Sequence, residues 1–471
     1  MYYKQGEFDH TERIENYIRY ELIRLGKHEE AFKKYIEQAG STYRRDINQG
    51  YPSLFYVINI AKEISRVSAD MLFGEIPKIT VEDSNQQEWL DNAIEKIGLF
   101  KTLYEGADFG SAKGDSVFRI TLKDGELSVA PINPGVYFPE INPHNVSEIP
   151  ERVEIRQPIK IEDVSYILIT TYEGGDISYR VVDKHGDPYP ESASYLQEQG
   201  LEDASIKIDE NSELVFHVKN SGVPTMFFGE SDYNDLELLF YSIDNRFSRI
   251  NSILDKHSSP ILEVDQKIFT SIREGGGFVP SLVSLGDGFD NQDNPVSSRY
   301  VVWDGKLQDS FEQLSRAIDM VLMISEISPS LVGKDMAGGA AESGRALKYR
   351  LIRTLAMKSR KEMYWGSMIK KLLWSLQDVS FQNKWTVAGK VSGEPLKVSV
   401  EWQDGIINDT IEQMEIVERQ LANGLISEED AIVQINGIDK DQAEKRLAEI
   451  QEKRARRSIF FTPPEDTIEE E

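Results

Sequence analysis

Two amphipathic segments separated by a stretch rich in glycine and proline restrict the fold of this chain more than any other feature. In the first segment, apolar side chains recur at steps of three and four, as on one face of a helix: Leu236, Leu239, Phe240, Ile243, Phe247, Ile250 and Leu254. A second helix is predicted from Phe311 and ends at Ser328, because a residue before proline leaves the α region. Short β runs are predicted between them, at 261–264, 278–285 and 300–303. The pattern predicts a helical stalk with a small β-rich cap.

Ahead of the stalk, the sequence predicts an α+β domain. Apolar stretches with helical spacing occupy much of the first hundred residues and end at Gly74 and Gly98. Two β-hairpins follow: one turns at Asp124-Gly125, and the other joins 164–172 to 177–182. Helices are therefore expected to accompany antiparallel sheet in the region that ends near His217.

A loop of small residues and then the longest predicted helix follow the stalk. The loop spans Ser328 to Glu342, and the helix continues from 343 to about 378. Beyond it, a strand is predicted at 398–402, and helices are predicted near 411–421, after Ser427 and after Asp439. The residues after Arg457 carry five acids and no base, which predicts a disordered tail.

The first half of the long helix is strongly basic in a chain whose net charge is −27. Between Ser343 and Lys361 there are seven bases and no acid: Arg345, Lys348, Arg350, Arg353, Lys358, Arg360 and Lys361. A solvated helix face is the simplest interpretation. In an acidic chain, however, such a segment is expected to meet acid, either in a neighbouring subunit or in DNA. A carboxylate satisfies the hydrogen-bond donors of an arginine well inside an assembly. We therefore favour a contact with a neighbouring subunit for Arg345, Lys348, Arg350 and Arg353.

Composition argues against several functional classes. A net charge of −27 repels DNA at long range, which does not suit a DNA-binding protein but does suit a channel through which DNA must slide. The same charge also has a simpler explanation, in that it keeps the protein soluble. The chain has no cysteine, so disulfides and thiolate metal sites are excluded. No secretory signal is predicted, and the most apolar run is far shorter than the ~20 residues of a membrane span.

The motifs of common enzymes are missing from the sequence. It contains no phosphate-binding G-x-x-x-x-G-K-[ST] loop, no G-x-G-x-x-G after a strand, no H-E-x-x-H and no G-x-S-x-G. Ser367 and Lys370 form S-x-x-K only inside the predicted long helix. Asp287, Asp290 and Asp293 cluster in a predicted loop, where a plain surface loop is favoured over a weak Ca²⁺ or Mg²⁺ site. No catalytic residue, cofactor or metal ligand is predicted. The alternative from another class is a nuclease or phosphotransferase on an α+β core; a head–tail adaptor is a third, although such chains are usually shorter.

The order of these elements resembles that of the portal proteins of long-tailed bacteriophages that infect Gram-positive bacteria. The most specific marker is Glu342-Ser343-Gly344-Arg345-Ala346-Leu347-Lys348, which is similar to the family's start of the long helix after its tunnel loop. Leu425 to Ala431 resembles the entry to the family's crown, and Gly74 with Ile76-Pro77 resembles an early stretch of the family. The resemblance implies a structural protein without enzymatic activity. It would form the channel for DNA packaging, retention and ejection at one capsid vertex.

The resemblance also implies a domain plan, a portal-type fold assembled as a cyclic, dodecameric ring. The plan has an α/β wing, a helical stem, a small β-rich clip and a helical crown. The wing would be 1–228 with 383–405 returning to it, the stem 229–257 and 309–328, the clip 258–308, the tunnel loop 329–342, the long wing helix 343–382, the crown 406–457, and the acidic tail 458–471.

The implied partners are double-stranded DNA, which passes without sequence reading, the terminase, the scaffold and major capsid proteins, and a head-completion adaptor. The implied location is the portal vertex of the virion, with assembly in the host cytoplasm. Copies of the loop would converge on the ring axis. There the loop is nearly neutral, because it has one base and one acid before Glu342, and this favours sliding over gripping. An ordinary flexible connector is the alternative. The predicted DNA-channel residues are Val332, Gly333, Lys334, Asp335, Met336, Ala337, Gly338 and Gly339.

Overall fold

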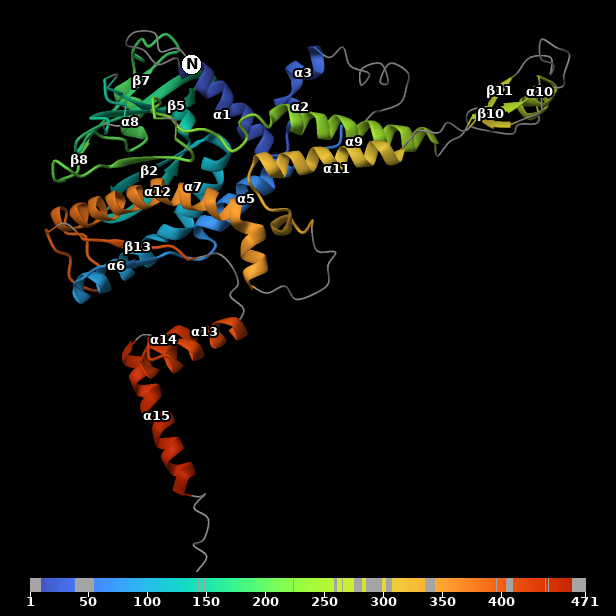
Figure 1. Ribbon diagram of the computed structural model, residues 1–471. Helices are drawn as coiled ribbons and strands as arrows, with labels where there is room; N and C mark the ends of the chain where they lie inside the picture. The colour runs from blue at the N-terminus through green and yellow to red at the C-terminus, as the bar shows by residue number, and fades with distance from the viewer. Residues whose placement is uncertain are drawn as a thin grey trace, which may run out of the picture. The chain divides into compact units, whose positions relative to one another are not determined.

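The computed structural model describes residues 10–38, 55–142, 144–146, 149–222, 224–257, 261–264, 266–274, 282–284, 299–301, 307–334, 344–394, 396–403, 410–436, 438 and 440–459. Helices and largely antiparallel sheets are mixed along the described chain, which confirms the predicted α+β class (Figure 1). The chain divides into two compact units. One consists of Met1–Met336 with Arg353–Gly405, and the other of Ala337–Ile352 with Ile406–Glu471.

The described part of the first hundred residues is mainly helical, as predicted. The elements are α1 (His10–Arg24), α2 (His28–Ala31), α3 (Lys33–Gln38), α5 (Ile60–Phe73), β1 (Lys78–Thr80), α6 (Ser84–Ile97) and α7 (Leu99–Lys113). Helices α5 and α6 end at the two glycines that the sequence indicated, and Gly98 takes a left-handed φ of 67° that suits a helix terminus. Strand β1 was not predicted. It pairs antiparallel with β13 (Ser399–Glu401), which confirms the strand predicted at 398–402.

Two antiparallel sheets follow. A three-stranded sheet places β2 (Asp115–Lys123) between β3 (Glu126–Ile132) and β9 (Val215–Lys219). A five-stranded sheet has the order β4 (Tyr137–Pro139), β5 (Arg152–Ile161), β6 (Val164–Glu173), β7 (Asp176–Val182) and β8 (Ala204–Ser205). Short helices η1 (Pro134–Val136) and α8 (Ser192–Glu198) lie in the connections. Both predicted hairpins are confirmed, and Asp124 and Gly125 both have positive φ, as a tight hairpin turn requires.

Helix α12 (Gly344–Gln382) is the longest helix in the described part of the chain, as predicted. Its Trp365 is buried in the main core and meets Phe73 of α5 and Phe118 of β2 edge to face, with ring centroids 5.1 and 5.9 Å apart. Burial of such aromatic side chains is a large favourable term in folding. Helix α12 therefore joins α5 and the three-stranded sheet through one hydrophobic core.

The stalk consists of α9 (Glu237–His257) and α11 (Leu307–Ile324), which lie side by side (Figure 1). Phe240, Ile243 and Ile250 of α9 share a second hydrophobic core with Leu314, Val321 and Leu322 of α11. Both helices are shorter than the stem segments that the resemblance implies, which are 229–257 and 309–328. Helix α9 begins only after Asp235, and α11 ends before Glu326, because both of these residues have a left-handed φ, of 63° and 59°.

The described part of the cap contains β10 (Ile261–Val264), α10 (Gln266–Glu274), β11 (Leu282–Ser284) and β12 (Arg299–Val301). Strand β10 pairs parallel with β11 and antiparallel with β12. The three predicted β runs are therefore confirmed where they are described, and parts of the last two lie outside the described residues. Helix α10 was not predicted. It is the connection that makes the parallel pairing of β10 and β11 possible.

The helices of the C-terminal unit beyond α12 are α13 (Thr410–Ala422), α14 (Glu428–Asn436) and α15 (Lys440–Ile459). The predicted helix start at Ser427 is confirmed, because the Ser427 hydroxyl accepts from the backbone N–H of Asp430 at 3.1 Å and the Asp430 carboxylate accepts from that of Ser427 at 3.2 Å. The predicted tail began at 458, but α15 continues to Ile459. The rest of the tail lies outside the described residues. In the described chain, no helix combines the length and the apolar character needed to cross a membrane.

Candidate functional site

The end of α11 is held in an unusual backbone conformation where the candidate DNA-contacting loop begins. Glu326 has a φ of 59°, which costs a non-glycine residue roughly 1–3 kcal/mol. The backbone N–H of Ile327 donates to Leu322 O at 3.0 Å, a bond that closes the helix end. The one-turn helix η2 (Pro329–Val332) follows, and Gly333 with φ 72° ends it. Glycine would adopt this backbone conformation without strain. The presence of glutamate here therefore indicates that the Glu326 side chain has a role.

The Glu326 carboxylate binds two arginines of α12. Arg353 donates to one carboxylate oxygen at 2.7 Å, and Arg360 donates to the other. Burial opposes ionisation of Glu326, but the hydrogen bonds from Arg353 and Arg360 outweigh it and lower the pKa of the carboxyl. Beneath this pair, the buried Thr354 hydroxyl donates to Glu326 O at 2.8 Å and accepts from the Ser328 N–H at 3.0 Å. The end of α11 is thus fixed to α12 through both side chain and backbone.

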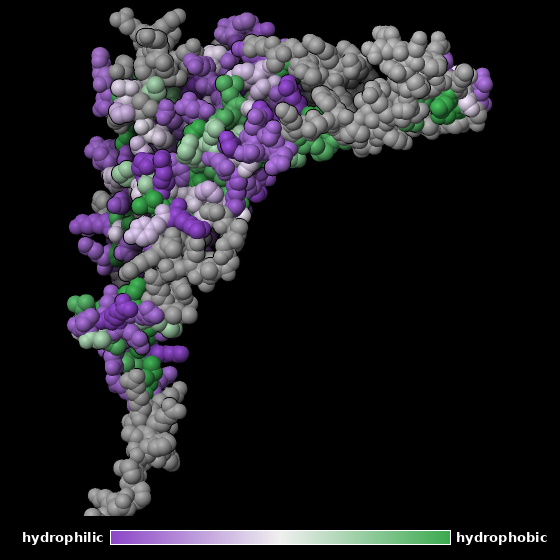
Figure 2. Space-filling model, turned by 45° about the vertical axis from the view of Figure 1, so that its right-hand side comes forward, coloured by the Kyte–Doolittle hydropathy of each residue, from purple (hydrophilic) through white to green (hydrophobic). Residues whose placement is uncertain are grey.

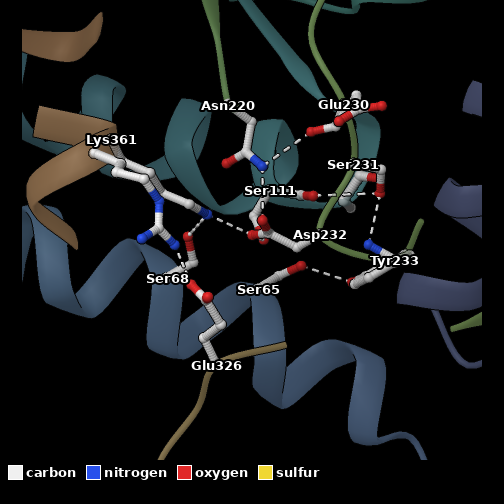
Figure 3. Close-up of polar contacts among 12 residues, drawn as sticks. Ser65, Ser68, Ser111, Asn220, Glu230, Ser231, Asp232, Tyr233, Glu326 and Lys361 are labelled. Atoms are coloured by element: carbon white, nitrogen blue, oxygen red, sulfur yellow. Dashed lines mark hydrogen bonds and ion pairs between the residues drawn. The ribbon is translucent and has the colours of Figure 1, made fainter. Parts of the chain in front are cut away.

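A second polar cluster lies where the chain enters α9 (Figure 3). Lys361 of α12 is only 3% exposed, and its Nζ donates to Asp232 Oδ2 at 2.5 Å and to Ser68 Oγ at 2.6 Å. Asp232 also accepts from Ser111 Oγ at 2.5 Å and from Asn220 Nδ2 at 2.8 Å. Burial lowers the pKa of Lys361, and the Asp232 carboxylate opposes that effect. Side chains of α7, α12 and the end of β9 therefore converge on one carboxylate ahead of the stalk, and Ser68 of α5 joins them through Lys361.

The residues beside Asp232 are fixed to the end of α7. Ser231 Oγ donates to Ala112 O at 2.5 Å and accepts from the Tyr233 N–H, and the Tyr233 hydroxyl contacts Ser65 Oγ at 2.6 Å. A Cβ on Gly229 would lie 2.3 Å from Gly114 O, which leaves no room for a side chain. We call Asp232, Lys361, Ser68, Ser111 and Asn220 the junction cluster. Its contacts are mutually satisfied, so it is suited to holding the stalk rather than to chemistry.

The structure places the predicted basic segment largely against acids of its own chain. Arg353 and Arg360 bind Glu326, Lys361 binds Asp232, and the buried Lys358 donates to Glu362 at 2.6 Å. Lys348 and Arg350 are exposed, while Arg345 is helical and its side chain is outside the described part. The prediction placed the acid in a neighbouring subunit or in DNA, but the acids that bind Arg353, Lys358, Arg360 and Lys361 lie in the same chain. A contact of Arg345, Lys348 and Arg350 with a neighbouring subunit stays a prediction.

Three of the predicted channel residues are described. Val332 is half-buried against the stalk core, Gly333 ends η2, and Lys334 contacts Asp319 of α11. Asp335, Met336, Ala337, Gly338 and Gly339 lie outside the described residues, as do Asp287, Asp290 and Asp293. Within the described chain, no three His, Asp or Glu side chains are grouped as metal ligands would be. No local pattern indicated Glu326 or Asp232, because each is a single acid without a motif around it.

Residues 4–457 match the family model described as "Phage portal protein, SPP1 Gp6-like". No curated protein matches the chain. Among solved structures, a chain from "Neck of native GTA particle computed with C12 symmetry" has 9% sequence identity and a TM-score of 0.43, covering 83% of this chain and 93% of that one. A chain from "Neck of empty GTA particle computed with C6 symmetry" has 11% identity and a TM-score of 0.47, covering 83% and 94%.

Proposed function

This chain belongs to the SPP1 Gp6-like family of phage portal proteins, and we propose that twelve copies of it form the ring-shaped DNA channel at one capsid vertex. The family match over residues 4–457 carries this conclusion, because it includes the stalk, the loop after it and the long helix. The geometry supports it, because α9 and α11 form a stalk and the chain is bound to α12 both just before α9, at Asp232, and just after α11, at Glu326. In this proposal the protein is a structural component and not an enzyme.

We assign the regions as the family plan predicts, with boundaries adjusted to the observed helices. The α+β domain is the wing, α9 and α11 are the stem, the β10–β12 region is the clip, and α13 to α15 belong to the crown. Residues 329–342 are the tunnel loop. DNA passes along these loops without sequence reading, and the terminase, scaffold, major capsid protein and head-completion adaptor bind the ring from outside. Assembly takes place in the host cytoplasm, and the ring stays at the vertex of the virion.

Exposed apolar residues on the stem support ring assembly. The packing of α9 on α11 covers one side of each helix, yet Leu238, Phe311, Met320, Met323 and Ile324 remain between 46 and 63% exposed. Hydrophobic side chains reach the surface of this part of the molecule in places (Figure 2). Such side chains favour a partner surface. A neighbouring subunit would cover them. A contact between two different surfaces of the subunit forms a closed ring when the rotation from one subunit to the next divides the full circle.

The basic helix offers a test of the subunit contact. The triple variant Arg345→Glu, Lys348→Glu, Arg350→Glu is expected to lose its rings more readily than the natural chain does, both at low salt and on dilution, because repulsion replaces attraction between neighbours. The melting temperature of the protomer should change little, since Lys348 and Arg350 are exposed and contacts of exposed charged side chains contribute little to stability. Native mass spectrometry measures the ring fraction.

The matched control carries the same change of charge on the wing, Lys160→Glu, Lys184→Glu, Lys207→Glu, at three exposed positions. Equal loss of rings in both triples would mean that total charge, and not this helix, is responsible. Intact rings that pass DNA poorly would indicate that the three residues lie on the channel wall and not between subunits.

A further inference from the structure

The only basic residue of the tunnel loop lies against the stem and not in open solvent. Lys334 Nζ donates to Asp319 Oδ1, and it lies 3.3 Å from both the backbone oxygen and the hydroxyl of Ser315. Ser315 and Asp319 are one turn apart on α11, so they present their oxygens on the same face. Between Ser328 and Glu342 the sequence has no other base. The cation that DNA would meet first is therefore engaged with the protomer's own carboxylate.

The rest of this segment is folded back in the same way. Leu331 and Val332 are half-buried against the stem core, and the Lys334 N–H donates to Pro329 O at 3.0 Å. Its root is fixed, because the Ser328 N–H donates to the buried Thr354. From this root, Lys334 reaches back to Ser315, more than two turns before the end of α11. The first part of the loop is thus laid along the helix that precedes it.

The two attachments differ in strength. The root of the loop is held by the buried Thr354 hydroxyl and by the Glu326 carboxylate, which binds two arginines. In contrast, the side chains of Lys334 and Asp319 are 32 and 53% exposed. An ion pair between exposed side chains contributes little to stability and is screened by salt. It can therefore be exchanged for an equivalent contact without disturbing the fold. A DNA phosphate offers Lys334 the same kind of partner that Asp319 does.

We propose that Lys334 and Asp319 form a latch that holds the first part of the tunnel loop against α11 and that the phosphates of passing DNA release it. While the latch is closed, the charge of Lys334 is neutralised and the loop does not grip DNA. When a phosphate takes Lys334, residues 329–334 leave the stem, and Asp319 is left without its counter-charge. This inference rests on the proposed position of the loop in the channel.

The test uses thiol labelling, because the natural chain contains no cysteine. The variant Leu331→Cys places a single thiol in the segment that the latch holds against the stem. In assembled full-length rings, adding Asp319→Asn is expected to raise the labelling rate roughly two- to fivefold, the range expected for loss of an exposed ion pair. A blunt-ended DNA duplex of about 30 base pairs should raise the rate in Leu331→Cys rings, and less so as salt increases.

Two further variants complete the design. Glu312→Gln removes the same charge from an exposed site on α11 that pairs with Arg316, and it should leave the rate unchanged. The variant Lys334→Gln removes the cation that phosphate would take, so DNA should not raise the labelling of this variant beyond its rate without DNA. Equal rates with and without Asp319→Asn would overturn the latch. A DNA effect that persists in Lys334→Gln rings would overturn its release by phosphate. Rings that package DNA normally without DNA-dependent labelling would reject the latch alone, whereas protein that forms no rings would reject the proposed function.

Discussion

Replacing Lys361 with methionine is expected to lower the free energy of unfolding of the protomer by about 3 kcal/mol. Methionine fills a similar volume, but it leaves Asp232 without its cation and Ser68 without a hydrogen bond. Loss of one partner of a buried pair costs about 3–5 kcal/mol. The lower end applies here, because the Asp232 side chain is 16% exposed and keeps its bonds from Ser111 and Asn220. Urea unfolding of the dissociated protomer measures the loss.

Two companion variants separate the junction cluster from a general effect on α12. Lys370→Met, at an exposed position of the same helix, should change the free energy of unfolding by less than about 0.5 kcal/mol. Adding Asp232→Asn to Lys361→Met should recover part of the stability, because the amide oxygen can still accept from Asn220, the amide N–H can donate to the Ser111 hydroxyl, and no charge is left buried. A Lys361→Met protein as stable as the Lys370→Met protein would mean that the cluster does not hold the stem.

Deleting Asp335 to Ala340 is expected to give rings that assemble normally but package or retain little DNA. The deleted part follows Leu331 and Val332, which pack on the stem core, and apart from Met336 it contains only small or polar residues, so its removal should not disturb the protomer. Both anchors of its root, Glu326 and Ser328, remain in place. In a ring, copies of the loop would form the narrowest point of the channel. A DNA-packaging assay with purified proheads measures the effect, and native mass confirms that rings are present.

A chain shortened by the same number of residues at its end, Asp466 to Glu471, is the matched control and should package DNA as the natural chain does. Intact loop-deleted rings with full packaging and retention would refute the position of the loop in the channel. That result would leave the membership of the portal family untouched.

Sequence patterns predicted the elements whose signals are local. The hairpin at Asp124-Gly125, the helix ends at Gly74 and Gly98 and the long helix after the loop all follow from residues close together in the chain. Pairings between distant segments could not be predicted in this way. Strand β1 is defined by β13, and β9 by β2, and neither partner is visible in the local sequence.

The site was harder to predict than the fold, for a physical reason. The basic segment was expected to meet acid in a neighbouring subunit or in DNA, whereas Glu326 and Asp232 of the same chain bind it, and these acids reach it only after the chain has folded. Helix α11 begins at Leu307, before the implied 309, but the implied start of the first stem helix at 229 and the implied end of the second at 328 both lie too far outward. The backbone there turns at Asp235 and Glu326, and the left-handed conformation of these residues depends on contacts that folding brings together.

Ring formation is the central claim, and the mass of the native assembly tests it most directly. Each subunit has a mass of 53.6 kDa, so native mass spectrometry should find a species close to twelve times that value, and negative-stain images should show a ring with a central hole. The stem residues that remain exposed in the protomer should be covered in that species. A protein that stays monomeric across concentration and salt would contradict the account.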